Sequence, residues 1–207
     1  MTAQSVVYVV DDDPSILASL ESLLSSEGHA VLTFESAQMF LEAKRPNLPG
    51  CLVLDVRLRG ASGLEFQREL MRSGIFTPIV FITGHGDVPM SVAAMEAGAI
   101  EFLMKPFRDQ DLLDAVHNGI EQDRHRRAQA AHMADLQARY TAMTPREREI
   151  LPLVASGLMN KQIATRLELS EVTVKVHRAQ IMQKLKAKTL ADLVRMADRL
   201  AGSIPKA

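Results

Sequence analysis

The strongest constraint on the fold is a run of four apolar residues, Cys51 to Leu54, that stops on Asp55. A short continuous apolar run is typical of a strand that is buried on both faces of a parallel sheet. An open parallel sheet holds its site at the carboxyl ends of its strands, and a carboxylate there is costly unless it does chemistry or binds a cation. We therefore predict that Asp55 is a nucleophile that accepts a phosphoryl group.

Five strand–helix units follow one another over roughly the first 120 residues. They predict an α/β domain, a flavodoxin-like five-stranded parallel sheet in the order 2-1-3-4-5 with helices on both faces. Asp13 and Pro14 predict the start of the first helix. The expected strands are 6–10, 30–34, 51–55, 78–82 and 100–104.

In this strand order the sheet opens a crevice where Asp11, Asp12 and Asp55 would converge. Clustered carboxylates repel one another, so they predict a counter-ion, and Mg²⁺ (or Mn²⁺) suits oxygen ligands. A carboxylate neutralised by a metal can attack a phosphoryl group and form an acyl phosphate. At the next two strand ends, Thr83 offers a hydroxyl and Lys105 an ammonium group to phosphoryl oxygens.

Charge is divided unevenly along the 207 residues. Residues 1–120 hold 16 Asp and Glu against 8 Lys and Arg, a net charge of -8, and residues 121–207 hold 9 against 16, a net charge of +7. This division predicts two domains with different partners, the basic one suited to a polyanion. The single cysteine, and the lack of an apolar run of about 18 residues or a signal segment, predict a cytoplasmic protein with no membrane partner.

Residues 109–140 contain no proline and one glycine, Gly119, and strong helix formers dominate them. They predict one long helix in which 123–140 is a semi-rigid linker between a domain at 4–122 and a domain at 141–203. A polar, flexible tether is the alternative. The Arg-rich patch at 124–127 is expected to be a solvated face.

Residues 141–203 predict a small all-α domain of four helices. Thr144-Pro145-Arg146-Glu147 is a capping box, and Asn160, Ser170 and Thr189 are expected to begin the next three helices. The second and third helices are joined by a tight turn, which is helix-turn-helix geometry. The alternative is a dimerisation or protein-docking domain with a solvated basic face.

The third of these helices has two different faces. Its apolar positions Val174, Ile181 and Leu185 should face the core. Val176 and Ala179 are apolar, so exposing them to water is unfavourable. In a DNA major groove they could contact thymine methyl groups, and Lys175 could contact guanine. The side chains expected to hold phosphates are Asn160, Lys161, Thr173, His177 and Arg178.

Residues 4–122 resemble the receiver domain of two-component response regulators. The matching pieces are Asp11-Asp12, Asp55, Thr83-Gly84-His85-Gly86 and Lys105-Pro106-Phe107. The resemblance implies that Asp55 is the phosphoacceptor and that Thr83 and Phe102 are switch residues. It also implies that Asp11, Asp12, Asp55 and the backbone carbonyl of Arg57 hold the metal. The loop Leu58-Arg59-Gly60 departs from the family, which usually has proline in place of Arg59.

Residues 140–201 resemble the LuxR-type helix-turn-helix of the NarL/FixJ response regulators. The match is carried by 144–147, 160–164 and 173–177, and the stretch from Gly84 to Met90 is close to the FixJ branch. The resemblance implies that the fourth helix can pair subunits on DNA. Ala179 stands where some relatives place a lysine that reads bases, so the operator need not match theirs.

These observations predict a two-component response regulator, a phosphorylation-switched transcription factor rather than a turnover enzyme. A sensor histidine kinase would phosphorylate Asp55, and the receiver would then form a homodimer on double-stranded DNA, with RNA polymerase as a further candidate partner. The expected dimer face includes Val92, Met95 and Ile100. The alternatives are a flavodoxin-like aspartyl-phosphate phosphohydrolase and a receiver with an RNA-binding or protein-binding output.

Overall fold

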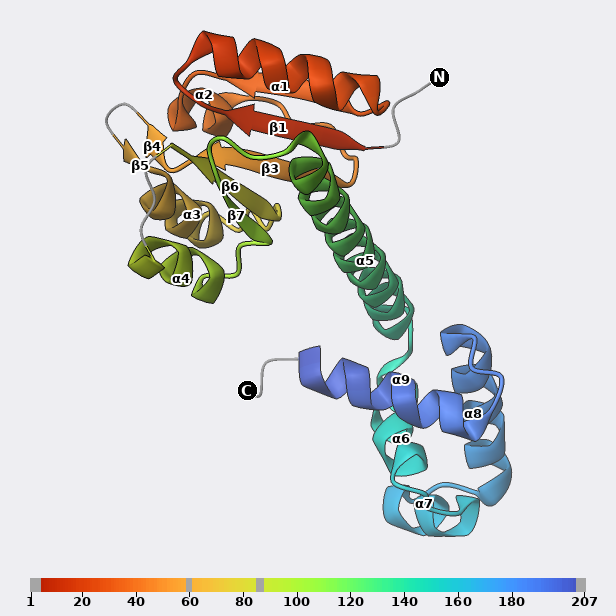
Figure 1. Ribbon diagram of the computed structural model, residues 1–207. Helices are drawn as coiled ribbons and strands as arrows, with labels where there is room; N and C mark the ends of the chain where they lie inside the picture. The colour runs from red at the N-terminus through yellow and green to blue at the C-terminus, as the bar shows by residue number, and fades with distance from the viewer. Residues whose placement is uncertain (1–4, 59–60, 85–87, 204–207) are drawn as a thin grey trace. The chain divides into compact units, whose positions relative to one another are not determined.

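The computed structural model describes residues 5–58, 61–84 and 88–203 (Figure 1). The chain divides into two compact units, Met1–Ala128 and Gln129–Ala207. Two stretches discussed above, Arg59-Gly60 and His85-Gly86-Asp87, lie outside the described residues.

The first unit is built on a five-stranded parallel sheet with the strand order β2-β1-β3-β6-β7. Numbered along the chain, this is the expected order 2-1-3-4-5, so the predicted fold class is confirmed. Every residue of β1, β3 and β6 is buried, which is why these strands are continuous apolar runs. The strands are β1 (Val6–Val10), β2 (Ala30–Phe34), β3 (Gly50–Asp55), β6 (Ile79–Thr83) and β7 (Glu101–Met104).

Helices cover both faces of this sheet (Figure 1). On one face α1 (Pro14–Ser26) and the first turns of α5 (Asp109–Thr141) pack on odd-numbered residues of β1 and β3. On the other face α2 (Ala37–Glu42), α3 (Gly63–Arg72) and α4 (Val88–Glu96) pack on the even-numbered ones. This alternation follows from the period of two in a strand. Asp13 caps α1 as expected, since its side chain accepts the Ser15 N–H at 2.8 Å.

Some boundaries differ from the sequence-based expectation. Thr83 is the last residue of β6 rather than the residue after it. A short antiparallel hairpin, β4 (Arg57–Leu58) and β5 (Ala61–Ser62), follows β3 and was not anticipated. Two-residue strands are too short to carry a hydrophobic period, so periodicity could not reveal them.

Helix α5 runs unbroken through the division between the units, as expected for residues 109–140. The Arg-rich patch on α5 is not simply a solvated face. Asp123 is buried, with 1% of its surface exposed, and it accepts hydrogen bonds from Arg127 Nε at 2.6 Å and Arg126 Nη2 at 2.5 Å. It also accepts the backbone N–H of Gly50, the first residue of β3, at 3.0 Å. Asp123 therefore fastens α5 to the central strand.

The second unit is helical. Its helices α6 (Pro145–Ala155), α7 (Asn160–Leu167), α8 (Glu171–Leu185) and α9 (Leu190–Ser203) enclose one core with the last turns of α5. Thr144, Ser170 and Thr189 cap α6, α8 and α9 through the expected side-chain bonds. In the described part of the chain, no helix has the length and apolarity needed to cross a membrane.

The expected cap at Asn160 is wrong by one residue. Met159 occupies the N-cap position of α7, and its backbone N–H donates to Gln162 Oε1 at 2.8 Å. Asn160 is the first helical residue, and its Oδ1 accepts Arg178 Nη1 at 2.8 Å. The side chain that sequence reasoning assigned to the cap instead ties α7 to α8.

Candidate functional site

The sheet brings four of the expected side chains to its carboxyl edge. Asp11 follows β1, Asp55 ends β3, Thr83 ends β6 and Lys105 follows β7. The ammonium Nζ of Lys105 donates to Asp11 Oδ2 at 2.7 Å and to Asp55 Oδ1 at 3.1 Å. Residues separated by up to 94 positions in the chain thus share one cation.

Asp55 is held in place by its own neighbours. Its Oδ2 accepts the backbone N–H of Arg57 at 2.7 Å, and only 6% of the residue is exposed. Gly63, at the start of α3, packs against this strand end, because a Cβ at that position would lie 2.5 Å from the Asp55 carbonyl oxygen. The carboxylate therefore has a fixed direction and limited access to water.

Asp11 and Lys105 are electrostatically linked. Burial raises the pKa of Asp11, and the hydrogen bond from Lys105 offsets that effect only in part. Burial alone would lower the pKa of Lys105, but the hydrogen bonds to Asp11 and Asp55 raise it above its ordinary value. Lys105 is therefore a cation at neutral pH, and Asp11 carries a charge that its surroundings incompletely compensate.

The donor set has the chemistry that Mg²⁺ prefers. Asp11, Asp12 and Asp55 supply hard carboxylate oxygens, and the three acids exceed Lys105 by two negative charges. Within residues 5–58, 61–84 and 88–203, no group of three or more His, Cys, Asp and Glu side chains has a metal-binding arrangement. Asp11 and Asp55 are joined by Lys105, and the assignment of Asp11, Asp12, Asp55 and the Arg57 carbonyl to a metal stays a prediction.

The two expected switch residues lie on adjacent strands. Thr83 is completely buried, and its carbonyl accepts the Lys105 N–H at 2.7 Å. Phe102, on β7, is half-buried, and its ring centroid lies 6.2 Å from that of Phe81 on β6. The peptide bond between Lys105 and Pro106 is cis.

Two of the three residues of the expected dimer face are well exposed. Val92 and Met95 on α4 are about half exposed, whereas Ile100 is partly buried against the core beneath α1 and α5. Two exposed apolar side chains that the sequence analysis did not single out are Val88 on α4 and Met104 at the end of β7, the strand that follows Ile100.

The second unit has a helix-turn-helix made by α7 and α8. The turn between them depends on Glu168, which adopts a left-handed conformation with φ 54°. The expected core positions Val174, Ile181 and Leu185 are fully buried. The opposite face of α8 is therefore presented to solvent.

The candidate DNA-reading side chains lie on that solvent face. Lys175 and Ala179 are exposed, and Val176 has 50% of its surface exposed. Among the candidate phosphate ligands, Lys161 is exposed and Thr173, His177, Arg178 and Asn160 are partly buried. Arg178 is held by Asn160, which fixes the direction of its guanidinium group.

An ion pair between Glu147 on α6 and Lys184 near the end of α8 was not anticipated from the sequence. Glu147 of the capping box is 1% exposed, and its Oε2 accepts Lys184 Nζ at 2.7 Å and the Thr144 N–H at 2.7 Å. Burial opposes ionisation, but these hydrogen bonds outweigh it and lower the pKa of Glu147. The pair joins α6 to the end of α8.

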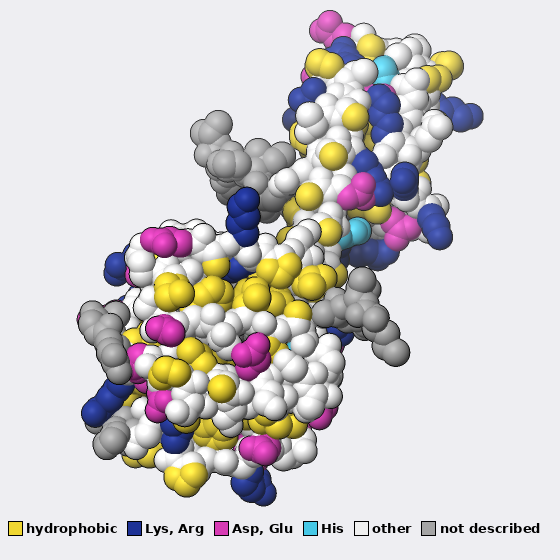
Figure 2. Space-filling view, turned by 90° about the horizontal axis from the view of Figure 1, so that it is seen from above, with side chains coloured by type: hydrophobic (Ala, Val, Ile, Leu, Met, Phe, Trp, Pro, Cys, Tyr) yellow, Lys and Arg dark blue, Asp and Glu magenta, His cyan; other side chains and the backbone are white. Residues whose placement is uncertain are grey.

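Figure 2 agrees with the basic charge of the second half of the sequence. On the face it shows, Lys and Arg side chains gather over the second unit, whereas acidic and basic side chains are interspersed over the first. A basic surface that carries a helix-turn-helix suits the phosphate backbone of a nucleic acid.

Two protein families match the chain. Residues 7–117 match the family described as response regulator receiver domain. Residues 141–197 match the bacterial regulatory proteins of the luxR family. The two matches fall on the two units.

Several curated relatives are similar over nearly the whole chain. Nodulation protein W of Bradyrhizobium diazoefficiens is 50% identical over 199 residues, which cover 96% of this chain and 88% of the relative. Response regulator protein TodT of Pseudomonas putida is 44% identical over 200 residues, covering 97% and 88%. Transcriptional regulatory protein FixJ of Rhizobium meliloti is 43% identical over 196 residues, covering 95% of each chain.

Solved structures are similar over nearly the whole chain. Response regulator StyR has 50% sequence identity and a TM-score of 0.85, covering 95% of this chain and 100% of its own. Full-length FixJ from B. japonicum has 40% identity and a TM-score of 0.57, covering 98% of this chain and 100% of its own.

Proposed function

The chain belongs to the two-component response regulators with a LuxR-type DNA-binding domain, and we propose that phosphorylation of Asp55 is its switch. Such a protein is a transcription regulator and not a turnover enzyme, which sets the phosphohydrolase alternative aside. The observation that carries the proposal is the buried carboxylate of Asp55 beside the Lys105 ammonium group, at the end of the central strand.

The proposed reaction is transfer of a phosphoryl group from a phosphohistidine of a sensor kinase. A bond between phosphorus and the histidine nitrogen breaks, and a bond between phosphorus and a carboxylate oxygen of Asp55 forms. Oδ1 is the better candidate, because Oδ2 is held by the rigid backbone N–H of Arg57. The Lys105 ammonium, which now pairs with Oδ1, can follow the charge onto the phosphoryl oxygens.

Receiver domains typically use Mg²⁺ for this transfer, and Mn²⁺ has the same preference for oxygen ligands. We assign Asp11, Asp12, Asp55 and the Arg57 carbonyl as the residues that would hold the ion. When bound, it would supply positive charge to the transferring phosphoryl oxygens.

The signal is proposed to leave the site through Thr83 and Phe102. The Thr83 carbonyl accepts a hydrogen bond from the Lys105 N–H. A shift of Thr83 towards a phosphoryl group would therefore move the segment after β7. That movement would change the face formed by α4 and β7, with Val92, Met95 and Ile100 as candidate contacts of a homodimer. A dimer presents two reading heads to paired half-sites.

The output is proposed to read double-stranded DNA through α8. Lys175, Val176 and Ala179 would contact base edges in the major groove. The side chains proposed to hold phosphates are Asn160, Lys161, Thr173, His177 and Arg178. We propose that 4–122 is the receiver domain, 123–140 the linker and 141–203 the output domain, acting in the cytoplasm with a histidine kinase and RNA polymerase as partners.

The decisive test of the switch is an Asp55→Asn variant of the full chain, incubated with a small-molecule phosphodonor. Acid-labile phosphorylation should disappear. Asp13→Asn is the matched control, because Asp13 is exposed and asparagine caps a helix equally well. Labelling that survives in Asp55→Asn would refute the assignment of the phosphoacceptor.

The reading helix is tested by selecting bound fragments from a random duplex library. Val176→Ala or Lys175→Ala should relax the base preference by about 1–3 kcal/mol per lost contact. Val172→Ala is the control, since Val172 lies on the same helix and is more exposed than Val176. Unchanged specificity in the Val176 and Lys175 variants, or tighter binding of RNA than of duplex DNA, would contradict the proposal.

A further inference from the structure

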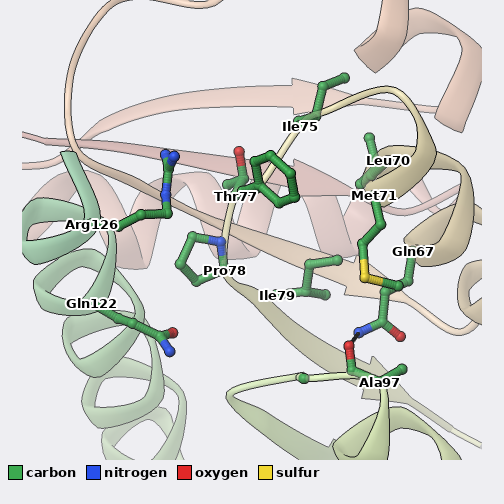
Figure 3. Close-up of a pocket in the computed structure, with 12 residues that line it drawn as sticks. Gln67, Leu70, Met71, Ile75, Thr77, Pro78, Ile79, Ala97, Gln122 and Arg126 are labelled. Carbon is green, nitrogen blue, oxygen red and sulfur yellow. Dashed lines mark hydrogen bonds between the residues drawn. The ribbon is translucent and has the colours of Figure 1, made fainter. Parts of the chain in front are cut away.

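A pocket of about 340 Å³ lies at the amino end of β6, opposite the edge that carries Asp55. Three elements of the first unit meet there. Figure 3 shows Leu70 and Met71 of α3 on one side, Gln122 and Arg126 of α5 on the other, and Ile79 between them. Nothing in the phosphorylation site or the reading helix uses this pocket. Its size falls at the lower end of the range for small-molecule sites.

The walls of the pocket are largely apolar, and two of its apolar side chains are exposed at the rim. Met71 is 43% exposed and Phe76, in the segment before β6, is 58% exposed. Gln67 closes the inner wall and is fixed there, because its Nε2 donates to the Ala97 carbonyl at 3.1 Å. Exposed apolar side chains around a preformed hollow are typical of a site that binds an apolar group.

The α5 side of the pocket carries an excess positive charge. Arg126 and Arg127 both pair with the single carboxylate of Asp123, so this cluster has one positive charge more than it has negative charges. Arg126 uses Nε and Nη2 for that pair, and Nη1 takes no part in it. Its side chain lines the pocket and is 43% exposed.

We propose that this pocket binds a small apolar carboxylic acid, with its carboxylate on Arg126 and its apolar body against Leu70 and Ile79. A carboxylate would neutralise the excess charge, and a guanidinium group is the preferred partner for it. An apolar body would cover Met71 and Phe76 at the rim. Because Arg126 also pairs with Asp123, the ligand would contact the cluster that fastens α5 to β3.

The test uses the absence of tryptophan from the chain. A Phe76→Trp variant of the full chain places one emitter at the rim of the pocket. Titration with 3-phenylpropanoate should give a saturable emission change below about 1 mM, and the neutral 3-phenylpropanamide should bind at least about tenfold more weakly. Phosphorylation of Asp55, measured in the same samples, reports separately on the proposed function.

Two further variants in this background locate the carboxylate. Arg126→Gln should abolish the preference for the acid over the amide, and Arg124→Gln should retain it. Arg124 is a matched control because it lies on the same helix but pairs with Glu121 and does not line the pocket. Absence of saturable binding, equal affinity for acid and amide, or equal effects of the two arginine variants would each overturn the proposal.

Discussion

The buried carboxylate of Asp123 should contribute strongly to the stability of the first unit, and Asp123→Asn measures that contribution. Three groups donate to this carboxylate, namely Gly50 N–H, Arg126 and Arg127. Asparagine has nearly the same shape and can still accept from Gly50, so the variant removes the charge and leaves the packing. The unpaired guanidinium groups can regain water, because their side chains are 43% and 34% exposed.

The size of the effect follows from these contacts. Hydrogen bonds to a charged group contribute roughly 1.5–3 kcal/mol each, against about 1 kcal/mol for neutral ones. Losing the charge should therefore cost about 1 kcal/mol per donor, or about 3 kcal/mol in the free energy of unfolding, at the low end for a broken buried pair. In a Phe76→Trp background, which reports on the first unit, the urea midpoint at pH 7 should fall by about 1.5 M.

The stabilisation by the Asp123 carboxylate should depend on pH. Burial raises the pKa of Asp123, but hydrogen bonds from Arg127, Arg126 and Gly50 outweigh it and lower the pKa below the ordinary value. A depressed pKa means that the stabilisation is present above about pH 4 and is lost as the pH falls through the folded-state pKa. The difference between the original chain and Asp123→Asn should therefore shrink in acid.

The matched control is Glu121→Gln, which breaks an ion pair with Arg124 on the same helix. Both of those side chains are well exposed, so the loss should stay below about 1 kcal/mol. The reasoning fails if Asp123→Asn costs no more than Glu121→Gln, or if its cost is as large at pH 3 as at pH 7.

Three other perturbations have definite expected results. Gly119→Ala places a Cβ 2.6 Å from Cys51 Sγ and should destabilise the first unit by about 1–3 kcal/mol in urea unfolding, with much of the loss recovered in the double variant with Cys51→Ala. Gly63→Ala places a Cβ 2.5 Å from the Asp55 carbonyl oxygen. It should slow phosphorylation by a small-molecule donor by a larger factor than the fall in stability accounts for. The raised pKa of Asp11 means that its contribution to stability is present below about pH 4 and is lost as the pH rises through the folded-state pKa. Mg²⁺ should therefore raise the urea midpoint more at pH 7 than at pH 4, and Asp11→Asn should remove most of that difference.

Much of the first unit could be predicted because its sequence signals are local. A strand that is buried on both faces must be a continuous apolar run, and each of the three central strands is such a run. Once the strands and their order are known, the residue after each strand has a defined place. This rule brought Asp11, Asp55, Thr83 and Lys105 to one edge without any knowledge of their contacts.

What the sequence did not reveal depends on distant partners. Asp123 binds Gly50, 73 residues away, and Glu147 binds Lys184, 37 residues away. Neither pair has a periodic or spacing signature, so the arginines that follow Asp123 were expected to form a solvated helix face, and Glu147 was expected only to cap a helix. The pocket beside Arg126 is likewise formed by segments that meet only in the folded chain.

The direction of the pKa change separates two kinds of buried acid in this protein. Asp11, Asp123 and Glu147 are almost equally buried. Asp123 and Glu147 have lowered pKa values because their partners outweigh burial, so their charge is satisfied within the fold. Asp11 has a raised pKa although Lys105 donates to it at 2.7 Å. A carboxylate that the fold buries and leaves under-compensated costs stability, and it is retained where a further cation or a reaction uses it. That contrast favours the Asp11–Asp55 edge over the arginine cluster on α5 as the proposed phosphorylation site.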